Sequence, residues 1–407
     1  MNQYGGIYVP TQDNEKLKES INWFIDNSKL AKITSGASGV VYSVTLNEDK
    51  KQQTPFLSLN FNSYKQPVTT LLMKMCVVFD DTKSEAEAEE YMNLTKDTLK
   101  KYGVGYVKKN DFIDEINIQT DIYLKTIEYL QPICPAIVYA GIYGDVKNSF
   151  DLNLLKNFDI KTSPTSSPTI GCIFMEFAEE YMSGNEFYDL LDVKAWRNTY
   201  VYLLLYMLIQ LSLKTGYTHG DHHLDNFMVN TKDKTYIKGM SARPIIIDFG
   251  RSTKIPPTEM DEIKRLCSEH NYNDVLQMLC KKPVANEYIA DPQYLKSHYG
   301  WGCGIPNDNQ MMTAYVIKEL NEKITNLFLA RERQIDINIF KMNQSHEQEP
   351  DKYPLLPLSN AEKNKLFGGL IGGFRKRRNY NKKRNVTRRR RFTKRRARKT
   401  HNRRIKY

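Results

Sequence analysis

Apolar side chains in the first part of the chain follow first a helical and then a strand spacing. Residues 15–30 predict an amphipathic helix, because one face collects the apolar positions Leu17, Ile21, Phe24 and Ile25. Residues 32–46 predict a β-hairpin, since β-branched residues flank a glycine-rich turn. The polar stretch 47–69 comes next, and it predicts an insertion before the following strand.

The next apolar segments alternate between strands and helices. Apolar runs predict three further strands, at 71–79, 135–144 and 170–178. Two helical patterns lie after the first of these runs, an acidic one around 84–101 and a second one over 112–130. Residues 145–169 predict a second insertion, because the Ser/Thr/Pro-rich end of this segment cannot continue a regular element.

Helical patterns dominate the second half of the chain. A long buried helix is predicted over 194–216, and its apolar run at 201–213 is too short to span a bilayer. Two short strands, at 227–230 and 244–250, precede a largely helical stretch over 257–340. Strands therefore come first and helices second, which predicts an α+β protein with a small sheet lobe and a larger helical lobe.

Charge divides the 407-residue chain into two parts. Residues 375–407 contain 19 Lys or Arg and no Asp or Glu, which leaves 40 basic and 47 acidic residues in 1–374. The body is therefore mildly acidic, and the formal net charge of +12 comes from the tail. The tail is too charged and too poor in apolar residues to pack, so we expect it to be disordered. A linker over 346–374 is expected to join it to the body.

Composition narrows the class of protein. A hydrophobic content of 41% and an aromatic content of 11% are typical of a folded globular chain. None of the six cysteines forms a C-x-x-C pair, so we expect reduced thiols rather than a disulfide framework or a zinc knot. No segment predicts a signal peptide or a transmembrane span, and we therefore expect a soluble, intracellular protein.

The stretch Tyr217–Asn230, YTHGDHHLDNFMVN, is unusually rich in histidine and aspartate. A zinc cage is disfavoured, because the adjacent His222 and His223 point in different directions and no second His/Cys cluster follows. A two-metal phosphatase needs further ligands downstream, and the sequence has no G-N-H segment to supply them. The spacing H-x-D-x-x-x-x-N from His219, followed by I-D-F-G at 247–250, indicates the two halves of a phosphoryl-transfer site.

Upstream segments complete a family resemblance. A glycine hairpin, a strand lysine, a helix glutamate and a hinge-like strand precede the two motifs in this order. In this order the chain resembles the protein-kinase-like superfamily over roughly residues 30–255, with residues to about 340 as the rest of the helical part. The resemblance implies a bilobal protein-kinase-like fold with an N-terminal helical extension at 1–30, an antiparallel-sheet N-lobe at 31–178 and a helical C-lobe at 179–345.

The resemblance also implies which residues would contact the phosphates and the adenine of ATP. Gly36 and Gly39 match the second and third glycines of the loop that covers the phosphates, and Thr34 replaces the first. Val41 matches the apolar residue that covers the adenine. Lys74 matches the lysine that holds the α- and β-phosphates.

The segment Met175-Glu176-Phe177-Ala178 resembles the hinge of this superfamily. The resemblance implies that Met175 is the gatekeeper and that backbone groups of Glu176 and Ala178 bind the adenine edge. The side chains carry little information here, because every residue offers a backbone.

A glutamate on the helix after the lysine strand is expected to pair with Lys74. We assign this role to Glu115, because its helix has an apolar face and leads directly into the next strand. Glu87 and Glu89 are the alternatives, on an acidic helix whose polar positions are typical of a solvated face.

The two downstream motifs carry the remaining roles that the resemblance implies. Asp221 matches the catalytic base, and Asn226 and Asp248 match the two Mg²⁺ ligands, whose hard oxygen donors suit that cation. His219 matches a position that mainly braces the loop and the D-F-G segment.

Three further departures separate the chain from typical protein kinases. Gly220 stands where those enzymes carry the arginine of H-R-D, which receives an activation-loop phosphate. His223 stands where Ser/Thr kinases carry lysine, and a histidine at this place resembles aminoglycoside and choline kinases. It either contacts the γ-phosphate or is a polar loop residue. No A-P-E segment follows I-D-F-G, so the usual peptide-docking platform is missing or rebuilt.

Three hypotheses about function stay open on the sequence. The first is a phosphotransferase that moves the γ-phosphate of Mg-ATP to Ser or Thr of a protein. The second is an atypical small-molecule kinase of the aminoglycoside or choline kinase type, with an alcohol as its acceptor. The third is a catalytically silent kinase-like scaffold that binds nucleic acid through its basic tail.

The tail at 375–407 indicates an electrostatic partner. Runs of Lys and Arg attach to nucleic acid by counterion release and also serve nuclear targeting, and an anionic membrane surface is another candidate. Tyr380 and Phe392 offer rings for stacking on bases. A solubilising tail without a specific partner is the alternative. A kinase-like body with such a tail also resembles kinase-like proteins of large DNA viruses, which would place it in a host cell or a virion.

Overall fold

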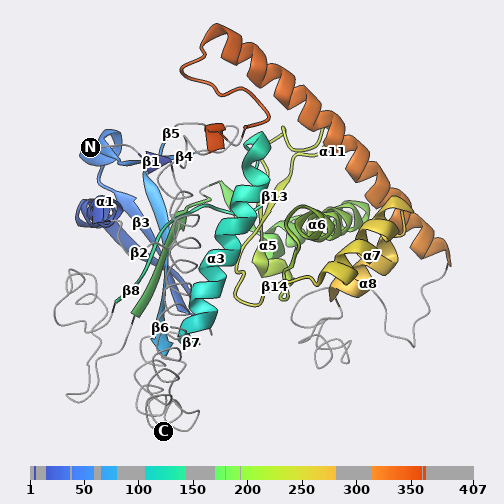
Figure 1. Ribbon diagram of the computed structural model, residues 1–407, viewed down its shortest axis with the longest axis horizontal. Coiled ribbons are helices and arrows are strands. Elements are labelled where there is room, and N and C mark those ends of the chain that lie inside the picture. Colours follow the sequence, from blue (N-terminus) through green and yellow to red (C-terminus); the bar gives the residue numbers. More distant parts are fainter. Residues whose placement is uncertain are drawn as a thin grey trace, which may run out of the picture.

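The computed structural model describes residues 4–5, 15–36, 39–58, 66–79, 106–143, 170–178, 180–192, 194–280, 314–359 and 361–363. These residues form a mixed α+β structure, in which an N-terminal antiparallel sheet of five strands is followed by a largely helical region. Figure 1 shows the sheet on one side, the helical region on the other and helix α3 between them. The α+β class that the sequence predicts is confirmed.

The sheet has the strand order β2-β3-β6-β9-β8, and every neighbouring pair in it is antiparallel. Its strands are β2 (Ser28–Gly36), β3 (Gly39–Leu46), β6 (Thr70–Phe79), β9 (Ile170–Glu176) and β8 (Ile137–Tyr143). A short strand, β7 (Tyr106–Lys108), extends the sheet by pairing in parallel with the end of β6 beyond its contact with β3. The expected hairpin and the expected strands are all present, and β6 lies in the middle of the sheet.

The N-terminal helix is shorter than its apolar pattern predicted. Helix α1 (Glu15–Asp26) ends four residues before the expected boundary, and β2 begins at Ser28. The helix is also part of the sheet core rather than an appendage, because Leu17, Ile21 and Phe24 are almost completely buried against the apolar side chains of the strands.

The stretch 47–69 is only partly an insertion. It contains η1 (Glu48–Gln53), β4 (Phe56–Ser58) and β5 (Gln66–Pro67), and β4 also pairs with β1 (Tyr4–Gly5). Phe56 is fully buried, with its ring centroid 5.8 Å from that of Phe24. A single large apolar side chain among polar neighbours therefore fixes this segment to the core.

Helix α3 (Lys109–Thr126), which ends in η3 (Ile127–Tyr129), packs across the sheet. The buried positions Phe112, Glu115, Ile116 and Gln119 follow the spacing of one helical face. Gly171 of β9 allows the close approach, since a Cβ atom at this position would lie 2.6 Å from the Phe112 ring. This packing fixes the height of Glu115 above the central strands.

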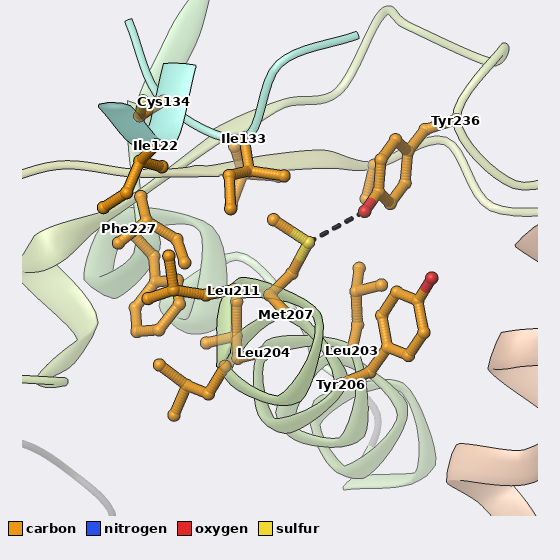
Figure 2. Packing of buried hydrophobic residues seen from close by; sticks show 14 of the residues in the cluster. Ile122, Ile133, Cys134, Leu203, Leu204, Tyr206, Met207, Leu211, Phe227 and Tyr236 are labelled. Atoms are coloured by element: carbon orange, nitrogen blue, oxygen red, sulfur yellow. Dashed lines mark hydrogen bonds between the residues drawn. The ribbon is translucent and has the colours of Figure 1, made fainter. Parts of the chain in front are cut away.

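Helix α6 (Lys194–Thr215) is the centre of the helical region and is buried on two sides. Leu203, Leu204, Met207 and Leu211 join a cluster with Ile122, Ile133 and Phe227, part of which is drawn in Figure 2. Leu205 and Ile209 join a second cluster, formed with α7 (Pro257–Ser268), α8 (Tyr272–Cys280) and α11 (Ala314–Gln348). Because both sides are covered, this helix is apolar nearly all round.

Short strands connect the sheet and the helices. Strands β10 (Tyr181–Ser183), β12 (Phe227–Asn230) and β13 (Arg243–Ile246) form a small sheet, and α5 (Gly184–Asp189) and η4 (Leu224–Asn226) lie beside it. Strands β11 (Tyr217–Thr218) and β14 (Thr253–Lys254) form an antiparallel pair. The predicted strand over 244–250 ends at Ile246, so the I-D-F-G residues lie beyond it.

The chain beyond α11 is not a free linker over its first part. Leu356 and Leu358 are buried, and the amide of Leu358 donates to the Glu128 carbonyl at the end of α3, 3.0 Å away. Lys363 Nζ lies 2.8 Å from the Glu128 carboxylate. The predicted linker therefore starts too early, because apolar side chains within it return to the body.

Several predicted segments lie outside the described residues. They are the acidic helix around 84–101, the insertion at 145–169, the last part of the linker and the basic tail. Among the described helices, none combines the length and the apolar character needed to cross a membrane.

Candidate functional site

Lys74 is the charged group at the middle of the sheet. It occupies the centre of β6, opposite Val41 of β3 and Ile173 of β9, and only 8% of its surface is exposed. Its Nζ lies 2.6 Å from Glu115 Oε1 of α3 and 3.2 Å from Asp248 Oδ1. A strand, a helix and a loop that are distant in sequence therefore place three charged groups together.

Electrostatics favours the charged forms of Lys74 and Asp248, whereas burial raises the pKa of the Glu115 carboxyl. Burial alone would lower the pKa of Lys74, but the carboxylates of Glu115 and Asp248 outweigh it and raise the pKa above its ordinary value. Burial acts to raise the pKa of Asp248, and Lys74 overrides it, so that the pKa of this carboxyl is lowered. At neutral pH the site thus holds a charged lysine against an ionised aspartate.

His219 braces the loop that carries Asp221. Burial lowers the pKa of His219, so the imidazole is neutral at neutral pH. The tautomer with a proton on Nε2 fits its two contacts: Nε2–H donates to the Ile247 carbonyl at 2.9 Å, and Nδ1 accepts from the Asp221 amide at 3.3 Å. One buried ring therefore ties the first motif to the segment that carries the second.

Asn226 and Asp248 lie on adjacent segments. The Asn226 side-chain amide donates to the Asp221 carbonyl at 2.7 Å, and its backbone carbonyl accepts from the Ile247 amide at 2.9 Å. Asp248 has a φ of 60°, a left-handed conformation that costs a non-glycine residue free energy and is concentrated at functional sites. The pairing of β12 with β13 brings the two motifs side by side.

Gly220 is required by the close approach of two chain segments. It has a φ of 78°, and a Cβ atom at this position would clash with the carbonyl oxygen of Arg251. The arginine of H-R-D has no room here, since any side chain would push the segment after Gly250 away. The local packing therefore requires glycine at this position.

The side chain of Asp221 faces outward from the loop. It is 29% exposed, with His223 Nε2 3.8 Å and Arg251 Nη1 3.6 Å from its carboxylate oxygens. The contact with Arg251 was missed in the sequence, although this arginine directly follows I-D-F-G, because the contact depends on the backbone turn at Gly250.

The glycine hairpin joins β2 to β3. Gly36 and Gly39 are paired residues in its register, and Thr34, in the place of the missing glycine, is opposite Val41. Gly39 has a φ of 147°, and a Cβ atom there would clash with the Met75 carbonyl oxygen. Val41 is half-buried directly opposite Lys74, which places the hairpin beside the charged cluster.

The expected hinge follows the end of β9. Met175 is buried, with its sulfur 4.0 Å from Gln119 Nε2 of α3. The amide of Glu176 donates to the Ala136 carbonyl at 2.9 Å, so this amide is not available for an adenine ring. The Ala178 carbonyl accepts from the Tyr181 amide at 3.0 Å, and among the described residues the Ala178 N–H donates no backbone hydrogen bond.

Glu87 and Glu89, the alternative partners of Lys74, lie outside the described residues. Within the described part of the chain, no group of three or more His, Cys, Asp and Glu side chains is arranged to hold a metal ion. A Mg²⁺ ion that binds together with nucleotide phosphates needs only one or two oxygen ligands from the protein, and Asn226 and Asp248 offer this donor set.

Comparison with known proteins finds no protein-family model that matches the sequence, and no match among the curated proteins.

Proposed function

We propose that the protein is an ATP-dependent phosphotransferase with a protein-kinase-like fold. The observation that carries the proposal is the convergence of Lys74, Glu115 and Asp248, with contacts of 2.6 and 3.2 Å, beside the loop that holds Asp221 and Asn226. A lysine for phosphate oxygens, carboxylate and amide oxygens for Mg²⁺ and an aspartate for a hydroxyl are the groups that phosphoryl transfer requires.

The order of the elements supports the kinase-like part of the proposal. The site groups occur along the chain as glycine hairpin, strand lysine, helix glutamate, hinge strand, base loop and metal-binding loop. The sheet carries the first groups, and α3 packs across it so that Glu115 reaches the lysine. These groups are distant in the sequence, and their meeting at one point favours this fold over coincidence.

In the proposed reaction, the γ-phosphoryl group of ATP passes to an acceptor hydroxyl. The bond from the γ-phosphorus to the bridging oxygen breaks, a new bond to the acceptor oxygen forms, ADP leaves and Asp221 takes the hydroxyl proton. Lys74, oriented by Glu115, holds the phosphates by charge. Asn226 and Asp248 would hold Mg²⁺, which neutralises the charge that develops on the phosphate oxygens.

The acceptor that we propose is a Ser or Thr side chain of a protein. Asp221 and Arg251 have side chains that are 29% and 52% exposed, so the base is open to a large substrate. A small-molecule alcohol is the second candidate, because Gly220 and His223 stand in a loop of the kind found in aminoglycoside and choline kinases.

The test is a transfer assay with γ-labelled ATP and three sets of acceptors: acidic proteins, basic proteins and a panel of amino alcohols and aminoglycosides. Labelled phosphoserine or phosphothreonine is the expected product. Label on the small alcohols alone would reject a protein substrate and support the second candidate. Absence of both label and any Mg²⁺-dependent rise in melting temperature with ATP would reject the phosphotransferase.

For the tail at 375–407 we propose a polyanionic partner, with nucleic acid as the first candidate. Its 19 basic residues without one acidic residue support binding by counterion release. Truncation at Gly368 is expected to abolish nucleic-acid binding, and binding by the full chain is expected to weaken steeply with salt. A scaffold without activity would keep this binding and lack ATP turnover. Asp248→Ala is the control, and it is expected to lose ATP turnover while it keeps nucleic-acid binding. That result would show that the two properties are independent.

A further inference from the structure

Arg251 occupies a fixed backbone position beside the base loop. The Ser252 hydroxyl donates to the His219 carbonyl at 3.0 Å, and the Ser252 amide donates to the Phe249 carbonyl at 3.0 Å. The Arg251 carbonyl fills the space that the missing side chain of Gly220 leaves. Because the segment is held on both sides of Arg251, its side chain always starts from the same point next to Asp221.

The guanidinium group of Arg251 has donors to spare. Its Nη1 is 3.6 Å from Asp221 Oδ1, which is longer than a hydrogen bond, and it donates no side-chain hydrogen bond to any of the described residues. Half of the side chain is exposed, so the ion pair adds little stability. A guanidinium carries five N–H donors in a planar fork that matches a carboxylate, so most of this capacity faces outward.

The described charged groups nearby do not occupy the outward-facing N–H donors of Arg251. Asp225, the next carboxylate in the loop, accepts a 2.7 Å hydrogen bond from Asn185 and lies against His223 at 3.9 Å. His223 lies on the other side of Asp221, 3.8 Å from its second carboxylate oxygen. The surface at which an acceptor hydroxyl would meet Asp221 is therefore bordered by the Arg251 guanidinium.

We infer that Arg251 selects the acceptor, by binding an Asp or Glu side chain of the substrate next to the phosphorylated Ser or Thr. This inference rests on the proposed function, since it assumes that the acceptor hydroxyl approaches Asp221. With the hydroxyl at Asp221, a group a few ångströms away on the same peptide reaches the guanidinium. A carboxylate there forms charge-assisted hydrogen bonds, whereas a Lys or Arg meets a like charge.

The test compares three Ser peptides that differ only in the residues flanking the serine: acidic, neutral or basic. The wild type is expected to show kcat/KM about 10- to 100-fold higher for the acidic than for the neutral peptide, mostly through a lower KM. In Arg251→Gln this ratio is expected to fall towards one, and in Arg251→Glu the basic peptide is expected to become the best substrate. Arg251→Lys is expected to keep part of the ratio, because it keeps the charge but not the fork.

Lys254→Gln is the matched control. It removes one positive charge from exposed strand β14, three residues away, and is expected to leave the ratio unchanged. A loss of the ratio in Lys254→Gln as large as in Arg251→Gln would show a general effect of surface charge and overturn the inference. The rise in melting temperature with Mg-ATP, measured on each variant, shows that the fold and the nucleotide site are intact.

The remaining outcomes separate the inference from the proposed function. A wild type that phosphorylates all three peptides equally, or that keeps its acidic preference in Arg251→Gln, overturns the role of Arg251 and leaves the phosphotransferase standing. A wild type that binds Mg-ATP, labels none of the three peptides and labels only the amino alcohols or aminoglycosides overturns the peptide substrate. A wild type that neither binds nor turns over Mg-ATP removes the proposed function itself.

Discussion

Two buried ion pairs of this protein are alike in burial and different in everything around them. Lys74 and Glu115 are 8% and 4% exposed, and Arg243 and Asp233 are 4% and 6% exposed. The first pair closes at 2.6 Å between a strand and a helix 41 residues apart. The second closes at 3.4 Å between residues at the two ends of one connection, ten residues apart.

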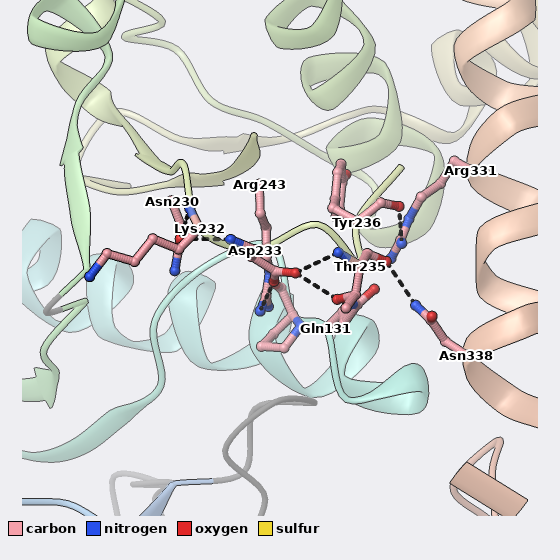
Figure 3. A network of polar contacts seen from close by, with 10 residues as sticks. Gln131, Asn230, Lys232, Asp233, Thr235, Tyr236, Arg243, Arg331 and Asn338 are labelled. Carbon is pink, nitrogen blue, oxygen red and sulfur yellow. Dashed lines mark hydrogen bonds and ion pairs between the residues drawn. The ribbon is translucent and has the colours of Figure 1, made fainter. Parts of the chain in front are cut away.

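The second pair belongs to a network of hydrogen bonds that joins three parts of the fold. Asp233 Oδ1 accepts from the amide and the hydroxyl of Thr235 at 2.8 and 2.6 Å. Asn338 and Arg331 of α11 then donate to the carbonyls of Thr235 and Tyr236 at 2.9 and 2.7 Å. Figure 3 shows these residues facing one another between the β12–β13 connection and α11. The network therefore holds these two parts of the fold together.

The first pair, in contrast, contacts a third charged residue that is partly exposed. Its third member, Asp248, has a side chain that is 36% exposed and holds a left-handed φ of 60°. Burial of charge alone therefore does not identify a functional site, because buried pairs also serve structure. What distinguishes the two is a member that remains exposed, in a strained backbone, next to a second motif.

The largest expected effect separates the pairs by activity. Lys74→Met is expected to lower the rate of phosphoryl transfer per folded molecule by about 10³-fold, because the phosphates lose their charged donor. The rate is measured at saturating Mg-ATP and normalised to the folded fraction found by circular dichroism. Lys264→Met, which removes an exposed lysine of α7, is the control and is expected to retain the wild-type rate. Wild-type turnover in Lys74→Met would erase the distinction between the pairs.

The next effect separates the pairs by stability. Arg243→Met leaves Asp233 buried without its cation and is expected to lower the free energy of unfolding by about 3 kcal/mol. Denaturant unfolding measures this, with transfer activity per folded molecule expected to stay within a few-fold of wild type. Arg265→Met is the control: its ion pairs are shorter, at 2.6 and 2.7 Å, but exposed, so a small change is expected. A larger loss in Arg265→Met than in Arg243→Met would contradict the weight given to burial.

The smallest effect is the pH dependence of stability that His222, in the loop of the first motif, contributes. Burial lowers the pKa of His222 to about 4 from an ordinary value of 6.5. Between these values the unfolded chain binds the proton more tightly, so stability must rise with pH from 4 to 6.5 and level off above, by at most about 3 kcal/mol from this residue. The lowered pKa values of His219 and Asp248 act in the same direction, and the difference between wild type and His222→Gln isolates His222. Parallel stability curves for the two proteins would show that His222 has no such shift.

The sequence predicted the elements that repeat a clear pattern. The strands at 71–79 and 170–178, the helix over 112–130 and the long helix over 194–216 all follow apolar spacings that tertiary packing preserves. The resemblance of the motifs also placed Glu115 opposite Lys74, and in the structure these two side chains meet.

The remaining features depend on contacts that no local pattern carries. Phe56 reaches Phe24 from a polar stretch, and Leu356 and Leu358 return from a segment expected to be a linker, because one or two apolar residues suffice to anchor a loop. Arg243 and Asp233 belong to no motif, and Arg251 meets Asp221 only through the turn at Gly250.

The central claim is that Asp221 serves phosphoryl transfer in a site built around Lys74 and Asp248. The most direct measurement is transfer of the γ-phosphate of Mg-ATP by wild type and by Asp221→Asn, with the rise in melting temperature on adding Mg-ATP recorded for both. We expect transfer by the wild type, a loss of about 10²-fold or more in Asp221→Asn, and the same thermal shift in both proteins. Equal transfer by the two proteins would contradict it.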